Sequence, residues 1–152
     1  MAPLRYIFIE VLKEEFTMAE SKNYGRVLDI PTLNASALAP NIVKRNVFGP
    51  GRFWDDWVMR HFILPAHEEI PPHRHDWDHL VYSISGKGEV EVEGEHYDLS
   101  KGNWARVPAG KEHTFRNVGD EPFEFFCIVP VYGDPHAKKA SMRAKRKTEK
   151  KD

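Results

Sequence analysis

The segment His73-Arg74-His75-Asp76-Trp77-Asp78-His79 carries three of the chain's eight histidines at even spacing. A fourth, His113, ends the segment Pro108-Ala109-Gly110-Lys111-Glu112-His113. Successive side chains on a β-strand point to opposite faces, so His73 and His75 share a face, and His79 returns to it if the chain stays extended. The two prolines that precede His73 disfavour a helix here. The four histidines therefore predict one metal site.

The alternative to a metal site is a coincidence of unrelated histidines. A single histidine is usually a surface residue or a satisfied core residue. Three on one strand face would repel one another when protonated, and would lose hydration without compensation when neutral and buried. Metal binding is therefore the favoured interpretation. Imidazole binds zinc, copper, iron, nickel and manganese, so the number of histidines alone does not name the ion.

The chain of 152 residues is long enough for one domain with a hydrophobic core. Its charge is uneven, because residues 137–152 carry eight Lys/Arg and two Asp/Glu, a net charge of +6, whereas the rest carries 14 basic and 21 acidic residues, a net charge of −7. The single cysteine, Cys127, excludes an internal disulfide and fits a reducing compartment. There is no apolar run long enough for a transmembrane helix, and the N-terminus lacks the layout of a signal peptide. A cytoplasmic protein without membrane contact is expected.

Short alternating segments separated by Gly, Pro and Asn predict an all-β domain. Glu89–Val92 alternates strictly between polar and apolar residues, and a Glu93-Gly94-Glu95 turn leads to a returning segment, His96–Leu99, as in a β-hairpin. Many short strands of this kind favour a sandwich or a barrel without an internal helix of convincing length. The other predicted strands are residues 54–64, 80–84, 104–107, 114–118 and 122–131.

The predicted organisation is an N-terminal extension (residues 1–30), a β-barrel domain (31–134) and a basic C-terminal tail (135–152). A short amphipathic helix is predicted within residues 1–20, and Met18 offers a second plausible start, so the first 17 residues are either an overcalled start or a short extension. The basic tail is expected to be flexible and solvated. Nucleic-acid contact through it is disfavoured, because no aromatic residues are interleaved with the charges.

The histidine-containing segments resemble the two motifs of the cupin superfamily. In the first motif, G-x5-H-x-H-x3,4-E-x6-G, His73 and His75 match the histidines, His79 stands where the glutamate would be, and Gly86 closes the motif. His67 replaces the leading glycine, a change expected to affect only a turn. The second motif, G-x5-P-x-G-x2-H-x3-N, is matched at every fixed position, by Gly102, Pro108, Gly110, His113 and Asn117.

The resemblance covers about residues 43–133 and is to the small single-domain four-histidine cupins that bind manganese. Val58-Met59-Arg60, Trp77 and the segment 125–130 look like that group. The resemblance implies an all-β, jelly-roll β-barrel with the metal inside, commonly as a homodimer. It also implies a first shell of four neutral histidines. Mn(II) is the favoured ion, followed by Fe(II), with Zn(II) or Ni(II) as alternatives.

Four protein ligands on an octahedral ion would leave two positions open, for a bidentate substrate or for a substrate together with dioxygen. A closed structural zinc site is the less favoured alternative, because such sites typically recruit cysteine thiolates. Arg60 could anchor an anionic substrate or be an exposed strand residue, and Cys127 could lie beside the ligands or be a small buried apolar residue. Strand parity and the resemblance predict a substrate pocket lined by Arg60, Trp77, Val81, Phe115, Phe125, Cys127 and Val129.

The sequence is compatible with three functions. A metal-dependent oxidoreductase, dioxygenase-like and acting on a small organic substrate, is favoured over a metal-dependent lyase or isomerase and over a non-enzymatic ligand-binding module or sensor. No catalytic residue beyond the ligands is identified. Tyr82, His61 and His67 are candidates for a general base by residue type alone, so redox or Lewis-acid chemistry is favoured over side-chain acid–base catalysis. The identity of the substrate is not predicted.

Overall fold

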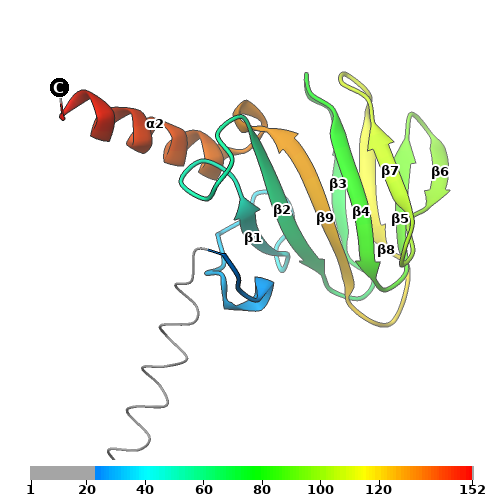
Figure 1. Cartoon of the computed structure of the whole chain (residues 1–152). Coiled ribbons are helices and arrows are strands. Elements are labelled where there is room, and N and C mark those ends of the chain that lie inside the picture. Colours follow the sequence, from blue (N-terminus) through cyan, green and yellow to red (C-terminus); the bar gives the residue numbers. More distant parts are fainter. Residues whose placement is uncertain (1–22, 152) are drawn as a thin grey trace, which may run out of the picture. The chain divides into compact units, whose positions relative to one another are not determined.

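The computed structural model describes residues 23–151 of the chain (Figure 1). The chain divides into two compact units, Met1–Pro31 and Thr32–Asp152. The described part of the first unit contains a short 3-10 helix, η1 (Val27–Asp29), with an ion pair between Arg26 and Asp29 at 2.8 Å. The amphipathic helix predicted within residues 1–20 lies outside the described residues.

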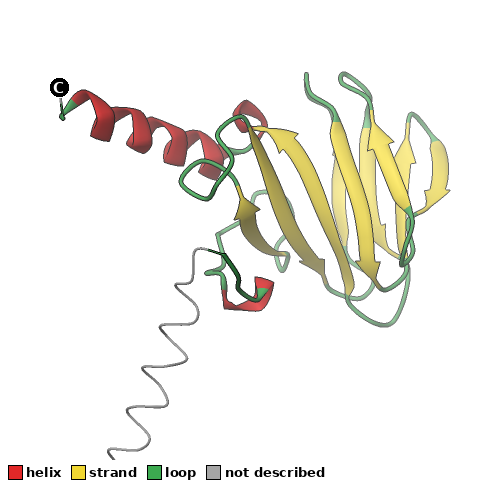
Figure 2. Ribbon diagram, viewed as in Figure 1, coloured by secondary structure: helices red, strands yellow, loops and turns green. Residues whose placement is uncertain are grey.

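The second unit is built from two antiparallel sheets, which are seen as yellow arrows in Figure 2. The predicted all-β jelly-roll architecture is confirmed. The five-stranded sheet has, in spatial order, β1 (Val43–Phe48), β2 (Trp57–Leu64), β9 (Phe123–Pro130), β4 (His79–Ser85) and β7 (Trp104–Val107). The four-stranded sheet has β3 (Glu69–His73), β8 (His113–Asn117), β5 (Gly88–Val92) and β6 (Glu95–Asp98).

Alternation of side chains along the strands builds the hydrophobic core. In β9 every second residue from Phe123 is buried, and in β4 His79, Val81 and Ser83 are buried while the residues between them are not. The two sheets meet through aromatic rings: Phe115 of β8 stacks on Phe125 of β9 with ring centroids 5.6 Å apart. Each fully buried ring of this size contributes about 2–3 kcal/mol through the hydrophobic effect. The same alternation turns His79 toward the interior.

The predicted hairpin is confirmed as β5–β6, with Val92 paired to Glu95 across a two-residue turn in which Glu93 and Gly94 both have positive φ. The strands β1 and β3 were not predicted. In β3 the cause is Pro71-Pro72, which cannot donate ladder hydrogen bonds; the structure accommodates them where the β3–β8 register shifts between Ile70 and His73.

The basic C-terminal segment, which was predicted to be a flexible and solvated tail, forms the helix α2 (Pro135–Glu149). Asp134 is the N-cap, and its side chain accepts a hydrogen bond from the backbone N–H of Ala137 at 2.8 Å. Pro135 occupies the first turn, where its missing N–H costs nothing. Lys, Arg, Ala and Met favour helix through the rest of the segment. Ala137 joins the hydrophobic core, so the helix begins as part of the barrel domain.

None of the helices in the described part of the chain has the length and apolar character needed to cross a bilayer.

Candidate metal centre

The four predicted histidines come together at one place in the barrel. His73 ends β3, His79 begins β4, His113 begins β8, and His75 lies in the loop between β3 and β4. One side-chain nitrogen from each can be chosen so that all four lie within 4.8 Å of one another. The antiparallel pairing of β3 with β8 places His73 opposite His113, which brings together residues 40 positions apart in the sequence. This is the arrangement that a single metal ion requires.

Backbone carbonyl groups fix the orientation of two of the rings. Nδ1 of His73 lies 2.8 Å from the carbonyl oxygen of Pro71, and Nδ1 of His113 lies 2.8 Å from that of Lys111. A carbonyl only accepts, so both Nδ1 atoms carry the proton and both Nε2 atoms keep a free lone pair. Nε2 of His113 is buried and has no hydrogen-bond partner among the described residues. Such an orphaned acceptor costs about 1–3 kcal/mol, which a bound cation would offset. The donor set therefore fits a divalent metal ion.

The other two rings approach each other directly. Nε2 of His75 lies 3.1 Å from Nε2 of His79, a separation at which two nitrogens share either a proton or a cation. The ring of His75 is also held by Trp77, which stacks on it at a centroid distance of 4.2 Å. Trp77 in turn packs against Gly133, where a Cβ atom would come within 2.8 Å of the indole. A side chain at position 133 would therefore push Trp77 off the histidine.

Burial favours the neutral form of three of the four rings, those of His75, His79 and His113. It lowers the pKa of His75 from 6.5 to about 4, with further contributions from His73 and His113. Burial also lowers the pKa of His79, assisted by the positive charge of Arg60, and it lowers the pKa of His113. Since only neutral imidazole binds a metal, these rings are ready to act as ligands at neutral pH.

Arg60 and Cys127 contact the far side of His79. Nδ1 of His79 lies 3.1 Å from Sγ of Cys127, and Nη2 of Arg60 donates to the same sulfur at 3.1 Å. Burial raises the pKa of the Cys127 thiol, although Arg60 opposes this shift. When Sγ accepts from Nδ1 of His79, the lone pair of that ring lies on Nε2, on the side of the cluster.

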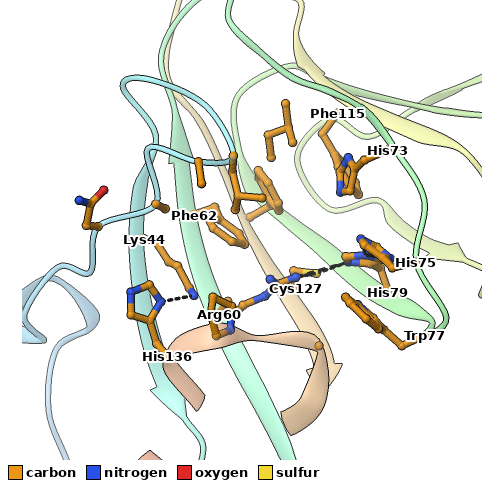
Figure 3. Close-up of a pocket in the computed structure, with 18 residues that line it drawn as sticks. Lys44, Arg60, Phe62, His73, His75, Trp77, His79, Phe115, Cys127 and His136 are labelled. Atoms are coloured by element: carbon orange, nitrogen blue, oxygen red, sulfur yellow. Dashed lines mark hydrogen bonds between the residues drawn. The ribbon is translucent and has the colours of Figure 1, made fainter. Parts of the chain in front are cut away.

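A cavity of about 180 Å³ opens beside the histidines (Figure 3). Its volume corresponds to roughly six water molecules. His73, His75 and His79 form part of its wall, and most of the remaining wall is apolar. Among the residues predicted for a substrate pocket, the structure places five in this wall: Arg60, Trp77, Phe115, Phe125 and Cys127.

Val81 and Val129, which were also predicted to line the pocket, belong instead to the hydrophobic core. Both have the predicted inward orientation and are almost fully buried. Val129 pairs with Val58 on β2, and Val81 pairs with Cys127 on β9. Strand parity identifies which side chains face the interior. It does not show which of them border a cavity and which pack against other core side chains.

Four polar residues of the cavity region, Asn34, Lys44, Asp134 and His136, were missed in the sequence. Lys44 on β1 lines the cavity, and its Nζ contacts a carboxylate oxygen of Asp134 and lies 2.9 Å from Nδ1 of His136. His136 also lines the cavity, from the first turn of α2. The residue pair Asp134-Pro135 was the available signal, because an N-cap followed by proline is typical of a helix start. Nothing in the pattern around Lys44 marks it as buried.

The residues considered as general bases by type lie elsewhere. His61 is buried against Glu124, with Nε2 and Oε1 2.5 Å apart, and His67 pairs with Asp120 at the surface. Tyr82 is exposed on the outer face of β4. None of the three lines the cavity.

Comparison with known proteins gives the family. Residues 60–129 match the family described as "Cupin domain". An uncharacterized protein of Aquifex aeolicus (strain VF5) is 32% identical over 86 residues, which cover 57% of this chain and 68% of that protein. Taken with the two-sheet barrel and the histidines, the family match identifies residues 60–129 as a cupin domain.

Two relatives carry functional names. The "Polyketide synthase CurC" of Streptomyces cyaneus is 37% identical over 75 residues, covering 48% of this chain and 49% of that protein. The "5-nitrosalicylic acid 1,2-dioxygenase" of a Bradyrhizobium species is 39% identical over 66 residues, covering 43% of this chain and 32% of that protein. This chain therefore matches half or less of each.

Among solved structures, the polyketide cyclase RemF from Streptomyces resistomycificus superimposes with a TM-score of 0.64 at 20% identity, covering 71% of this chain and 78% of that one. At this identity the similarity shows the fold alone.

Proposed function

We propose that the protein is a metal-dependent oxidoreductase, dioxygenase-like, that acts on a small organic substrate. His73, His75, His79 and His113 would hold the ion. The observation that carries the proposal is that these histidines cluster within 4.8 Å of one another while three of them also line a largely apolar cavity. A structural metal needs no such access, because its ligands close around it.

The chain's own residues would orient the reactants and limit access of water. When bound, a divalent ion would supply Lewis-acid polarisation of a substrate oxygen and, if it is redox-active, electron transfer to dioxygen. Mn(II) is the favoured ion, followed by Fe(II), with Zn(II) or Ni(II) as alternatives. Phe115 and Phe125 provide an apolar surface for the substrate body, and Trp77 keeps His75 in place by stacking. The name of the Bradyrhizobium relative supports oxygenase chemistry.

A second candidate function is a metal-dependent lyase or isomerase, with no consumption of dioxygen. The observation that favours it is the pair of buried cations, Lys44 and Arg60, on the cavity wall. Positive charge placed where an enolate develops stabilises it without any electron transfer.

The test combines metal analysis with oxygen uptake. Protein purified from unsupplemented medium is analysed for metals, and then stripped and reloaded with Mn(II), Fe(II) or Zn(II) before oxygen uptake is followed with a panel of small aromatic and aliphatic acids. Uptake that requires both the redox-active ion and a substrate supports the oxidoreductase. Turnover under strict anaerobiosis, with Zn(II) also effective, selects the lyase or isomerase. A protein that holds no metal after reloading overturns both.

We also propose that the protein forms a homodimer through the outer face of the five-stranded sheet. Leu80, Tyr82 and Trp104 are exposed there, and Trp104 is 76% exposed. They border an apolar depression whose floor includes Phe126 and Ile128. Contiguous apolar surface of this kind is typical of a contact with another protein. The proposed partner on this surface is a second copy of the chain. Trp104 lies on β7, which is an edge strand of the sheet, so β7 can contact the β7 strand of a symmetry-related copy.

A further inference from the structure

Two cationic side chains are buried in the cavity wall, on the side reached from β1 and β2. Lys44 is 2% exposed and Arg60 is 6% exposed. Figure 3 shows Lys44 beside His136, and Arg60 beside Cys127 next to the histidines. Arg60 spans the distance between the two groups, because its Nη2 lies 3.4 Å from Nδ1 of His79 and its Nη1 lies 3.6 Å from Asp134.

The charges in this wall do not balance. Asp134 is the one carboxylate that contacts Lys44 or Arg60 among the described residues, and it contacts both. None of the described residues that line the cavity is acidic. Two cations and one carboxylate leave a net charge of +1, and the histidine side chains add no negative charge. A bound divalent ion would increase the excess further. Uncompensated charge at a buried site is costly, so a ligand that brings a negative charge is favoured.

Both cations also have hydrogen-bond donors to spare. Lys44 has three N–H groups, of which two are used, by Asp134 and by His136. Nε of Arg60 is buried and has no partner in the described part of the chain. An unsatisfied buried donor is unusual in a folded protein, and it is the arrangement expected where a ligand supplies the missing acceptor.

The rest of the cavity wall determines the polarity and the size of the part of the ligand that lies beyond the charged group. Phe62, Ile70, Phe115 and Phe125 contribute apolar surface, and the volume of about 180 Å³ admits a molecule of roughly one ring with its substituents. We infer that the substrate is a small carboxylate with an apolar, ring-sized body, whose carboxylate is held by Lys44 and Arg60. This inference rests on the proposed function, because it names the substrate class of the same cavity.

The first turn of α2 belongs to this binding site. Asp134 holds Lys44 in place and caps the helix with the same carboxylate group, through Oδ2 and Oδ1 respectively. His136 supplies the second contact to Lys44. Binding of the carboxylate would therefore involve residues from β1, β2 and the start of α2, while the ligand body reaches toward His73, His75 and His79.

The test uses the metal-free, full-length protein with two probes of similar size, benzoate and benzyl alcohol, and measures their binding by calorimetry. Metal-free protein is chosen so that benzoate cannot bind through the ion. The wild-type protein should bind benzoate at least about tenfold more tightly than benzyl alcohol, since hydrogen bonds between charged groups are stronger than those of a neutral hydroxyl. Lys44→Met should remove most of this preference and leave benzyl alcohol affinity unchanged. Lys101→Met, at an exposed position, is the matched control and should behave as wild type.

A double variant covers the case in which Lys44→Met fails to fold. Lys44→Met with Asp134→Asn removes both members of the ion pair, and asparagine retains the helix cap. Arg60 then stands without a carboxylate, so the double variant should keep part of the wild-type preference for benzoate over benzyl alcohol. Equal affinity of the wild-type protein for the two probes overturns the inference, as does a parallel loss of both in the folded variants.

Failure of this inference is distinguishable from failure of the proposed function. A preference for benzoate in a protein that takes up no metal and no oxygen retains the carboxylate site and overturns the catalytic proposal alone. Metal-dependent turnover in a protein that binds benzoate and benzyl alcohol equally well retains the catalytic proposal and overturns the carboxylate site alone.

Discussion

His75 and His79 face each other with their Nε2 atoms 3.1 Å apart, although one lies in a loop and the other begins a strand. The contact joins the loop after β3 to the start of β4, and it brings two imidazole nitrogens together in a partly buried place. Two neutral acceptors at this separation repel unless a proton or a cation lies between them. The geometry of the whole cluster therefore depends on what occupies the space between the four rings.

Removal of any ligand should release the metal. Substitution of His73, His75, His79 or His113 by Ala should weaken metal binding by at least about 100-fold, which is the upper end of the loss seen when only an outer partner of a ligand is removed. His79→Glu, which restores the carboxylate of the usual motif, should retain a metal with an altered preference. Elemental analysis after equilibrium dialysis measures both effects.

His96→Ala is the matched control, because His96 is exposed and pairs with Glu89 away from the cluster. It should retain the full metal content. Unchanged metal content in all four alanine variants would contradict the assignment of the site.

Acid should destabilise the metal-free protein between about pH 6.5 and pH 4. The folded state holds the pKa of His75 near 4, whereas an unfolded histidine titrates near 6.5. Between these values the unfolded state binds a proton that the folded state does not, so stability falls as pH decreases. His75 should contribute on the order of 1–2 kcal/mol, after allowance for its partial exposure. Urea denaturation at a series of pH values measures this, and His75→Gln should show a flatter profile. An unchanged slope in that variant would refute the explanation.

The buried ion pair between Lys44 and Asp134 predicts non-additive stability. Lys44→Met should cost about 3–5 kcal/mol, because it leaves a buried carboxylate with Arg60 as its remaining cation. The additional change Asp134→Asn should restore much of this loss. Arg74→Met is the control, since the Arg74–Glu112 pair is exposed at both ends and should contribute less than about 1 kcal/mol. Denaturant titration of the wild type, Lys44→Met, Asp134→Asn and the double variant gives the coupling energy, and simple additivity would argue against a buried pair.

The proposed dimer predicts a change of mass on substitution of one surface residue. Trp104→Glu places a charge in the apolar patch and should convert the dimer to a monomer without loss of fold. Analytical ultracentrifugation reports the mass and circular dichroism the fold. Tyr24→Glu, at an exposed aromatic of the first unit, serves as the control. A wild-type protein that sediments as a monomer at micromolar concentration would rule the dimer out.

Local rules were sufficient for much of the architecture. The even spacing of His73, His75 and His79, together with the fixed offsets around His113, located the cluster, because strand periodicity puts such residues on one face. Strict alternation also gave the β5–β6 hairpin. By contrast, β3 was not predicted, because it contains two prolines, which are unfavourable in most strands. The structure accommodates them at a register shift.

The parts that escaped prediction depend on contacts between distant segments. Lys44 resembles any surface lysine in sequence, and only the folded chain brings it to Asp134, 90 residues away. The charge run after Asp134 suggested a solvated tail, yet a capped first turn and good helix formers make it α2. Val81 and Val129 have the right parity but lie where other core side chains fill the interior. Strand parity and amino-acid composition show which side chains face inward, but not whether other core side chains cover them.

The placement of Asp134 and His136 has a practical consequence for anyone who shortens this protein. A fragment cut after the last strand would keep both sheets and all four histidines. It would lack Asp134, which is the carboxylate partner of Lys44, and His136, which forms part of the cavity wall. The start of the lysine-rich helix α2 is therefore part of the cavity wall, because Asp134 and His136 both contact Lys44.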